Sequence, residues 1–306
     1  MIKNYLSLVK FSHTIFAMPF ALIGFFLGIS NLQSLSFLKV YMLSNLSVYE
    51  KTKIFFQHQW WIFILVLLCM VFARSAAMAF NRWLDANFDA KNPRTAVREI
   101  PAGVIKSSNA LFFVVANCLL FIIATFFINR LCFFLSPVAL FVILFYSYTK
   151  RFTALCHLVL GVGLSLAPIG AYLSVTNEFA LLPVLFSLAV LFWVSGFDII
   201  YALQDEAFDK ENQLHSIPVA LGKVKALRLS ELLHLIAAVC ILFAGYYGAF
   251  GFFYWAGAGF FAGLLIYQHL LVKPNDLSKV NMAFFTTNGI ASVVFAILVI
   301  LDIFLY

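Results

Sequence analysis

The chain has 306 residues, of which 64% are hydrophobic and only 11% are charged, and its mean hydropathy is +0.99. This composition excludes an ordinary soluble domain, because such a domain needs a charged surface that these residues cannot provide. With so few charged residues, a net charge of +7 belongs to loops that face lipid headgroups or an anionic substrate, and it does not favour nucleic acid.

Apolar runs follow one another along almost the whole chain. A bilayer core needs about 20 apolar residues per helix, and about nine such runs are present. The predicted membrane helices are residues 13–30, 60–81, 109–129, 132–148, 154–175, 180–201, 224–249, 252–271 and 282–304. The sequence therefore predicts an all-α polytopic membrane protein in which residues 1–306 form one domain. The linker 31–59 is expected to hold a short interfacial helix.

Lysine and arginine are distributed unevenly between the two ends of the predicted helices. Only Lys39, Lys51, Lys53 and Arg130 fall in segments on the outer side, whereas nearly all the others fall on the side of the N-terminus. This bias predicts that the N-terminus is cytoplasmic. The first apolar run has no small-residue cleavage site after it, so we expect a retained helix rather than a signal peptide.

A polar stretch follows the second predicted helix. In it, Asn81, Asp85 and Asp89 recur every four residues, so a continuing helix would place all three on one face. Two carboxylates at this spacing repel each other in an isolated helix, and the arrangement is more typical of a seat for a divalent cation such as Mg²⁺.

A second acidic stretch, with Asp198, Asp205 and Asp209 on one helical face, ends or follows the sixth predicted helix. Four membrane crossings separate the two stretches, so both emerge on one side of the membrane and face each other.

The two acidic stretches also resemble each other in sequence. Residues 85–89, DANFD, align with residues 205–209, DEAFD, and the IPAG of 100–103 is echoed by the Ile, Pro and Gly of 217–222. The match predicts a parallel repeat, with two similar four-helix units and a ninth helix around a central cavity.

Basic residues lie close to both acidic stretches. They are Arg74, Arg94, Arg98, Lys150 and Arg151. Mg²⁺ is often shared between carboxylates and a substrate phosphate, and arginine binds phosphate oxygens with two parallel hydrogen bonds. An aromatic and aliphatic cavity suits an isoprenoid tail, and a desolvated aromatic face stabilises an allylic cation by about 2 kcal/mol or more. Together these features predict ionisation of a prenyl diphosphate at the membrane surface.

Segments 74–103 and 196–222 resemble the two signature motifs of the UbiA superfamily of intramembrane aromatic prenyltransferases. The family pattern is Asn-Asp-x-x-Asp-x-x-x-Asp followed by a second Asp-x-x-x-Asp, and the likeness extends over nearly the whole chain, including KFSHT at 10–14 and YTKR at 148–151. One position departs from the pattern, because Arg82 stands where the family usually has Asp. Arg82 is therefore expected to contact phosphate or a lipid headgroup.

The resemblance implies a metal site, a diphosphate site and a reacting centre. The implied Mg²⁺ ligands are Asn81, Asp85, Asp89, Asp205 and Asp209. The residues expected to hold the diphosphate are Arg94, Lys150 and Arg151, with Arg98 added for its charge and position. The catalytic group comprises Asp198 and Tyr201 near the reacting centre, together with Arg74, which supports the diphosphate.

Within the family, the chain most resembles the 4-hydroxybenzoate polyprenyltransferase group. This implies Mg²⁺-dependent transfer of a polyprenyl group from polyprenyl diphosphate to the ring carbon of 4-hydroxybenzoate, in ubiquinone biosynthesis, with active-site loops on the cytoplasmic side of a bacterial inner membrane. A dihydroxynaphthoate acceptor, as in menaquinone biosynthesis, is the alternative. Asp198 is expected either to remove the ring proton or to orient the acceptor hydroxyl.

Two other functional classes remain open at this point. An ion-coupled transporter would also use intramembrane acids and a repeat, but here the acids lie at one membrane face rather than at the midplane. A scaffold that only binds isoprenoid lipids would not need so many facing carboxylates.

Other polar residues receive ordinary structural interpretations. The histidines are dispersed and have no metal-ligand spacing; His13 and His215 adjoin the predicted site, and interfacial hydrogen bonding is expected for most of the others. Asp302, near the outer end of the last helix, is expected to reach water.

Overall fold

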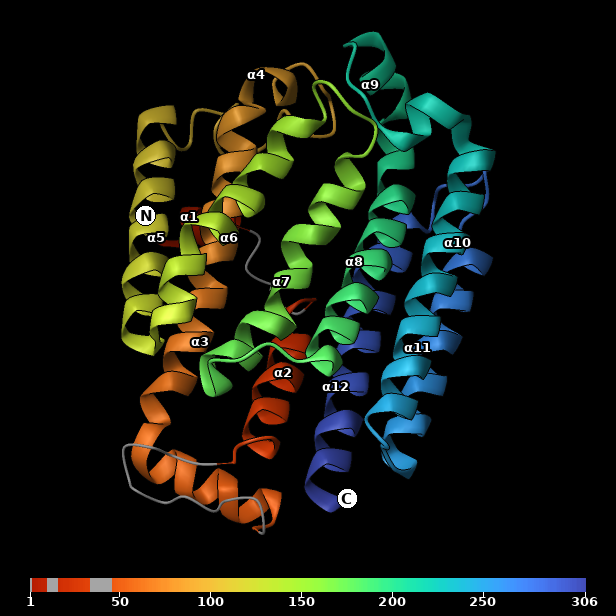
Figure 1. Ribbon diagram of the computed structural model, residues 1–306. Helices are drawn as coiled ribbons and strands as arrows, with labels where there is room; N and C mark the ends of the chain where they lie inside the picture. Colours follow the sequence, from red (N-terminus) through yellow and green to blue (C-terminus); the bar gives the residue numbers. More distant parts are fainter. Residues whose placement is uncertain (1, 10–15, 34–45) are drawn as a thin grey trace.

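The computed structural model describes residues 2–9, 16–33 and 46–306, and the regular elements within these residues are helices. The long helices are α2 (Met18–Ser30), α3 (Val48–Leu84), α5 (Ser107–Ile128), α6 (Arg130–Thr149), α7 (Cys156–Thr176), α8 (Leu181–Ala202), α10 (Ile217–Tyr247), α11 (Phe252–Leu271) and α12 (Asn288–Leu305). The short elements are α1 (Ile2–Leu8), α4 (Ala86–Asp89), the 3₁₀ turn η3 (Leu203–Asp205), α9 (Glu206–Glu211) and the π-helical η4 (Met282–Thr287). The long helices run side by side in one bundle (Figure 1).

Each predicted membrane helix coincides with one of the long helices, which confirms an all-α integral membrane protein. In the described chain, 7 helical segments are long and apolar enough to cross a membrane. The other two predicted spans match α2, which has 13 residues, and α11, whose hydropathy is lowered by Gln268 and His269 near its end. Residues 13–15 of the first predicted span lie outside the described residues.

Helix α3 joins two helical segments at a kink. Gln59 has non-helical angles, φ −140° and ψ 26°, and the second segment begins where the membrane helix was predicted to begin. The first segment starts with a capping box in which Ser47 and Glu50 bond each other's backbone N–H groups. This segment is the short helix that was expected in the linker 31–59.

The predicted repeat is visible in the backbone. Helices α3 and α8 each lead to an aspartate outside helical geometry, Asp85 (φ −92°, ψ 6°) and Asp205 (φ −101°, ψ 0°), and each is followed by a short helix, α4 or α9. Further along, Gly103 (φ 73°) and Gly222 (φ 75°) adopt the left-handed conformation that glycine accepts without strain. Helices α4 and α9 lie at the same end of the bundle, at the top of Figure 1.

Helix α8 packs between α7 and α10 in the interior of the bundle. Gly161 of α7 allows the close approach, because a Cβ atom there would lie 2.3 Å from Ser195 Oγ and 2.5 Å from the Leu191 carbonyl oxygen. Trp193 of α8 is fully buried and donates a hydrogen bond to Asn288 Oδ1 at 2.9 Å. These contacts fix the helix that carries Asp198 and leads to Asp205.

The prediction that Asp302 reaches water was wrong. Its side chain is 1% exposed, and its carboxylate accepts hydrogen bonds from the backbone N–H groups of Gly251 (2.7 Å) and Tyr254 (3.0 Å). The turn between α10 and α11 packs against the end of α12, so Asp302 satisfies the free N–H groups at the start of α11.

Candidate active site

A polar cavity of about 560 Å³ lies at the end of the bundle that carries α4 and α9. Both acidic stretches line it, as the repeat predicted. The acidic residues on its wall are Asp85, Asp89, Asp198, Asp205 and Asp209, the amide residues include Asn81, and the basic ones are Arg74, Arg82, Arg94, Arg98, Lys150 and His157. The structure thus brings together every residue of the predicted site except Arg151.

Arg94 connects the two halves of the cavity. Its Nε donates to Asp205 Oδ1 at 3.0 Å, its Nη2 pairs with Asp205 Oδ2, and its Nη1 donates to the Tyr201 hydroxyl at 2.9 Å. The guanidinium also lies over the Tyr201 ring, 5.3 Å from its centroid. A residue of the loop after α4 thereby holds the second acidic stretch with charge-assisted hydrogen bonds.

The other carboxylates of the predicted metal site are paired as well. Arg98 Nη1 lies 2.8 Å from both oxygens of Asp89, and Lys150 Nζ lies 2.7 Å from Asp209 Oδ1. Together with Arg94–Asp205 and Arg151–Asp85, these make four ion pairs between the two sets of residues that the sequence assigned to metal and to diphosphate.

Arg151 lies beside the cavity rather than on its wall. Its Nη2 donates to Asp85 Oδ1 at 2.9 Å and to the Leu84 carbonyl at 3.0 Å, and its Nη1 donates to the Ser147 carbonyl at 3.1 Å. The guanidinium therefore satisfies carbonyl groups at the ends of α3 and α6 while it orients Asp85. Spacing along the sequence gave no sign of this role.

The charge states of the loop residues follow from burial and pairing. Burial raises the pKa of Asp85 above the usual carboxyl value, and Arg151 offsets this only in part. For Lys150, burial favours the neutral form, but the nearby Asp209 outweighs it and the pKa of Lys150 is raised. Asp205 and Tyr201 likewise overcome burial and raise the pKa of Arg94. Arg94 and Lys150 therefore stay cationic at neutral pH.

Arg82, the residue that departs from the family pattern, pairs with an acid of the protein. Its Nη1 lies 2.6 Å from Glu99 Oε2, with side-chain exposures of 4% and 13%, and Glu99 also accepts a hydrogen bond from Ser7 of α1. Glu99 belongs to the loop that carries Arg94 and Arg98. The ion pair therefore ties this loop to α3, and the contact with phosphate or a lipid headgroup expected from the sequence is not needed to explain Arg82.

Reversing this charge pair tests its role in holding the loop. We expect Arg82→Glu to lower the thermal stability of the detergent-solubilised protein and its activity, because breaking a buried pair costs about 3–5 kcal/mol. The double variant Arg82→Glu/Glu99→Arg should recover most of both. Lys91→Glu, an exposed charge in the same loop, is the matched control. A double variant no better than the single one would contradict the pairing.

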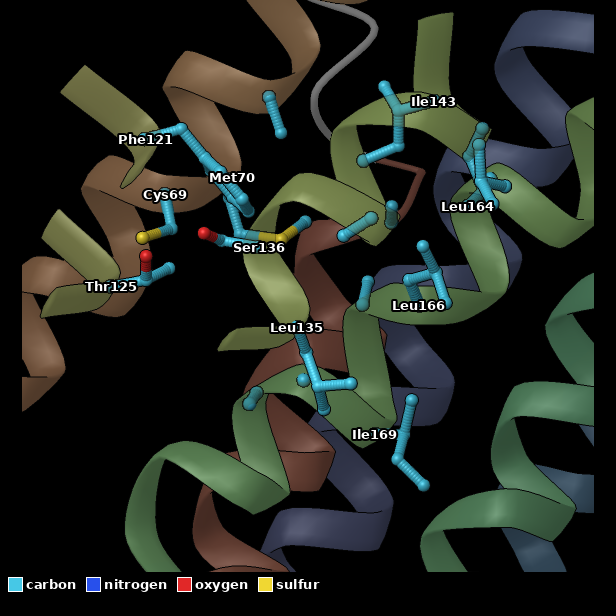
Figure 2. Close-up of a pocket in the computed structure, with 18 of the residues that line it drawn as sticks. Cys69, Met70, Phe121, Thr125, Leu135, Ser136, Ile143, Leu164, Leu166 and Ile169 are labelled. Carbon is cyan, nitrogen blue, oxygen red and sulfur yellow. The ribbon is translucent and has the colours of Figure 1, made fainter. Parts of the chain in front are cut away.

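An apolar cavity of about 390 Å³ lies deeper in the bundle, between α3, α5, α6 and α7. Figure 2 shows its wall, with Cys69 and Met70, Phe121, Leu135 and Ile169 among the side chains drawn. The two cavities share five lining residues, which are Arg74, Met78, Tyr146, Leu160 and Leu164. A polar chamber thus meets an apolar one at the level of Arg74.

Arg74 differs from the other cations of the site. Its Nε is enclosed and has no hydrogen-bond partner, and among the described residues no carboxylate pairs with its guanidinium. A buried cation without a partner is costly, so the position favours an anionic ligand group.

His157 is a cavity residue that the sequence did not single out. Its Nδ1 lies 2.7 Å from Asp198 Oδ2, although the two residues are 41 positions apart. His215, which was expected to adjoin the site, contributes its backbone N–H to the Lys150 carbonyl at 2.8 Å. His13 lies outside the described residues.

The donor atoms fit Mg²⁺, since they are carboxylate and amide oxygens. In the part of the chain that the structure describes, no three His, Cys, Asp or Glu side chains converge as a complete metal site. Mg²⁺ usually keeps several waters and uses one or two carboxylates together with substrate phosphates. The arrangement therefore fits a metal that is shared with a bound diphosphate.

The sequence matches the model of the UbiA prenyltransferase family over residues 17–290. The chain belongs to this family. It is therefore a membrane-embedded prenyltransferase with the all-helical fold that the resemblance implied.

Named relatives and solved structures agree with the family. The chain is 27% identical over 237 residues to a 4-hydroxybenzoate octaprenyltransferase of Francisella tularensis, covering 78% of this chain and 83% of the relative. It is 29% identical over 241 residues to one of Aliivibrio fischeri, covering 77% and 82%. Among structures, a UbiA homologue from Aeropyrum pernix superposes with a TM-score of 0.73 at 26% identity, over 94% and 95% of the two chains.

A second UbiA structure shares the fold at lower identity. The UbiA homologue from Archaeoglobus fulgidus, whose structure contains DMAPP and Mg²⁺, superposes with a TM-score of 0.66 at 20% identity, over 99% of this chain and all of the other.

Proposed function

We propose that this UbiA prenyltransferase transfers a polyprenyl group from polyprenyl diphosphate to a ring carbon of 4-hydroxybenzoate and releases diphosphate. The observation that carries the proposal is the meeting of a charged cavity with an apolar one at Arg74 and Tyr146. Such a junction suits a substrate with an ionic head, a hydrocarbon tail and a reactive carbon between them.

The acids of the charged cavity would hold the metal. Its ligands would be drawn from the predicted set, Asn81, Asp85, Asp89, Asp205 and Asp209. When bound, Mg²⁺ neutralises charge on the diphosphate leaving group. The presence of Mg²⁺ and DMAPP in the Archaeoglobus fulgidus homologue supports this assignment.

The cations of the cavity would bind the diphosphate itself. Arg94, Arg98 and Lys150 line the wall, and each is paired with a carboxylate of the predicted metal site. With Mg²⁺ on those carboxylates, these cations would be available to the phosphate oxygens, which accept the same hydrogen bonds. Arg151 keeps Asp85 in place from outside the wall.

The apolar cavity would take the prenyl tail. Its lining has few polar atoms, and Val138 and Phe179 on it are 59% and 63% exposed at the surface of the bundle, where lipid surrounds the protein. A long tail therefore continues from the cavity into the bilayer, which favours a polyprenyl donor over a short one.

The resemblance assigned Arg74 to the diphosphate, but its unpartnered position at the junction of the two cavities favours a contact with an acidic acceptor instead. The carboxylate of an aromatic acid would neutralise it at the junction where the prenyl carbon is released. The names of the bacterial relatives favour 4-hydroxybenzoate. A dihydroxynaphthoate carries the same carboxylate and hydroxyl groups, so it is the alternative acceptor.

The chemistry of the acceptor follows from the groups at the junction. The acceptor ring attacks the prenyl carbon as the carbon–oxygen bond to the diphosphate breaks, and an aromatic face such as that of Tyr146, which lines both cavities, would stabilise positive charge on the allylic group. Asp198 would then accept the proton that the ring carbon loses. The electron pair of that C–H bond restores the aromatic ring.

We place the charged cavity at the cytoplasmic face of a bacterial inner membrane, with the N-terminus inside. The distribution of lysine and arginine supports this orientation. The whole chain, residues 1–306, would act as a single domain in which both halves contribute to one cavity.

The test of the function is direct. Membranes that contain the protein are incubated with Mg²⁺, a long-chain polyprenyl diphosphate and either 4-hydroxybenzoate or a dihydroxynaphthoate, and the prenylated product and diphosphate are measured. Product from 4-hydroxybenzoate supports a ubiquinone-type reaction, and product from the naphthoate alone moves the enzyme to a menaquinone route. Absence of product and of Mg²⁺-dependent diphosphate release with both would contradict the proposal and favour a transporter.

Filling the apolar cavity should discriminate between donors of different length. Gly163 lies on the cavity wall, and a Cβ there has only Ile143 Cα, at 3.9 Å, as a neighbour. We expect Gly163→Leu to lower kcat/KM about 10-fold or more for a long polyprenyl diphosphate, because the added side chain takes tail volume. Turnover of geranyl diphosphate should change little. Gly259→Leu, on α11 with no atom near its Cβ, is the control, and equal losses for both donors would contradict tail binding here.

A further inference from the structure

His157 and Asp198 form a hydrogen-bonded pair on the wall of the polar cavity. His157 is the second residue of α7 and is 3% exposed, and Asp198 lies near the end of α8. The Nδ1–Oδ2 distance is 2.7 Å, and both side chains line the cavity. The pair is separate from the four ion pairs of the metal and diphosphate residues.

The tautomer of His157 follows from its other neighbour. The backbone N–H of Ile217, the first residue of α10, points at His157 Nε2 at 3.4 Å. A backbone amide only donates, so Nε2 accepts and carries no proton. Nδ1–H therefore donates to Asp198 Oδ2.

The surrounding helices keep the ring in this position. Ser195 Oγ of α8 donates to the His157 carbonyl at 3.2 Å, and Gly161 allows α7 to lie directly against that serine. Three helices thus hold the imidazole in place. Helix α7 carries His157, α8 donates a hydrogen bond to the His157 carbonyl, and α10 donates one to the ring Nε2. The described residues form no hydrogen bond with Asp198 Oδ1, and the Asp198 side chain is 22% exposed.

We propose that His157 is a positioning residue, which holds Asp198 Oδ2 so that Oδ1 faces the acceptor and takes the proton released by its ring. This inference rests on the proposed function and deepens it. In the step, the new carbon–carbon bond forms with a ring electron pair, the carbon–oxygen bond breaks onto the diphosphate, and the ring C–H pair returns to the ring as its proton moves to Asp198 Oδ1. No oxidant or reductant is required.

A purely structural role for His157 makes a different prediction. A buried histidine that only joins α7, α8 and α10 would affect stability and the amount of folded enzyme, but not the rate of proton removal. The two roles are therefore separated by a kinetic isotope effect measured with an acceptor deuterated at the ring carbon that is prenylated.

The variants are chosen to keep or remove the two hydrogen bonds. Glutamine in His157→Gln places an amide N–H toward Asp198 and a carbonyl toward the Ile217 N–H, so kcat should stay within about 3-fold of wild type, without a new isotope effect. His157→Leu loses both bonds, and we expect kcat to fall about 10- to 100-fold, as for other residues that orient a reactive group. KM for both substrates should stay nearly constant, and a primary deuterium isotope effect on kcat should appear.

His157→Ala serves if the leucine variant does not fold. It also removes both hydrogen bonds, so kcat should again fall and the isotope effect should appear. Full kcat, or a lowered kcat with no isotope effect, in the folded variant would overturn the inference. The two failures are distinguishable, because a wild-type enzyme that prenylates no aromatic acid overturns the proposed function, whereas an active wild type with unaffected variants overturns only the role of His157.

Discussion

Replacing Asp85 with asparagine is expected to lower prenyl transfer at least about 1,000-fold while leaving the protein folded in the membrane. The amide removes a negative charge from the predicted Mg²⁺ site and turns the ion pair with Arg151, whose Nη2 lies 2.9 Å from Asp85 Oδ1, into a weaker hydrogen bond. Asp205→Asn should have a similar effect in the other half of the cavity, where the carboxylate is held by Arg94. Product formation at saturating Mg²⁺ and polyprenyl diphosphate measures both losses.

Asp276→Asn is the matched control for these variants. Asp276 is an exposed acid between α11 and η4 whose side chain bonds Ser278, and it is not on the cavity wall. Its replacement should leave activity unchanged. Substantial activity in Asp85→Asn or Asp205→Asn would refute the assignment of the metal site.

Arg74→Met is expected to raise KM for 4-hydroxybenzoate about 100-fold, whereas KM for the polyprenyl diphosphate should change by less than about 3-fold. The factor of 100 corresponds to about 2.7 kcal/mol, within the range for losing one partner of a buried charge pair. The reason is that Arg74 stands at the junction of the two cavities with no carboxylate of the described protein beside it. The acceptor carboxylate would therefore be its partner.

The choice of acceptor sharpens this experiment. Phenol lacks the carboxylate, so wild type should prefer 4-hydroxybenzoate strongly and Arg74→Met should lose most of that preference. Arg130→Met, an exposed arginine at the other end of α6 from Lys150, is the control and should keep the wild-type preference. A variant of Arg74 that binds the diphosphate poorly but keeps its acceptor preference would place this cation with the donor instead.

Periodicity along the chain predicted the helices and the acidic face, but not the contacts that join them. Long apolar runs determine membrane helices almost by themselves. The four-residue spacing of Asn81, Asp85 and Asp89 correctly brought these residues to one cavity wall, even though regular helix ends at Leu84. Local spacing was sufficient because the chain continues into α4 after a single non-helical residue.

The sequence predicted that the two acidic stretches face each other, but not the individual side-chain contacts between distant segments. His157 and Asp198 meet because α7 and α8 approach closely at Gly161, and no spacing rule connects residues on different helices. Arg151 was assigned to diphosphate from its charge, whereas its contacts with carbonyl groups depend on where α3 and α6 end. Asp302 was predicted to reach water because it lies near the outer end of the last helix. The turn between α10 and α11 packs against it and buries it.

The repeated halves of the protein match in their acids but not in their bases. Arg94 and Arg98 follow Asp89 in the first half, whereas no arginine lies between Asp209 and Gly222 in the second. Acids alone would present nearly the same face to a diphosphate in either of two orientations related by the repeat. Because only one half supplies these arginines, a diphosphate would bind in one of the two orientations. That orientation determines on which side the leaving group departs and on which side the prenyl carbon meets the acceptor.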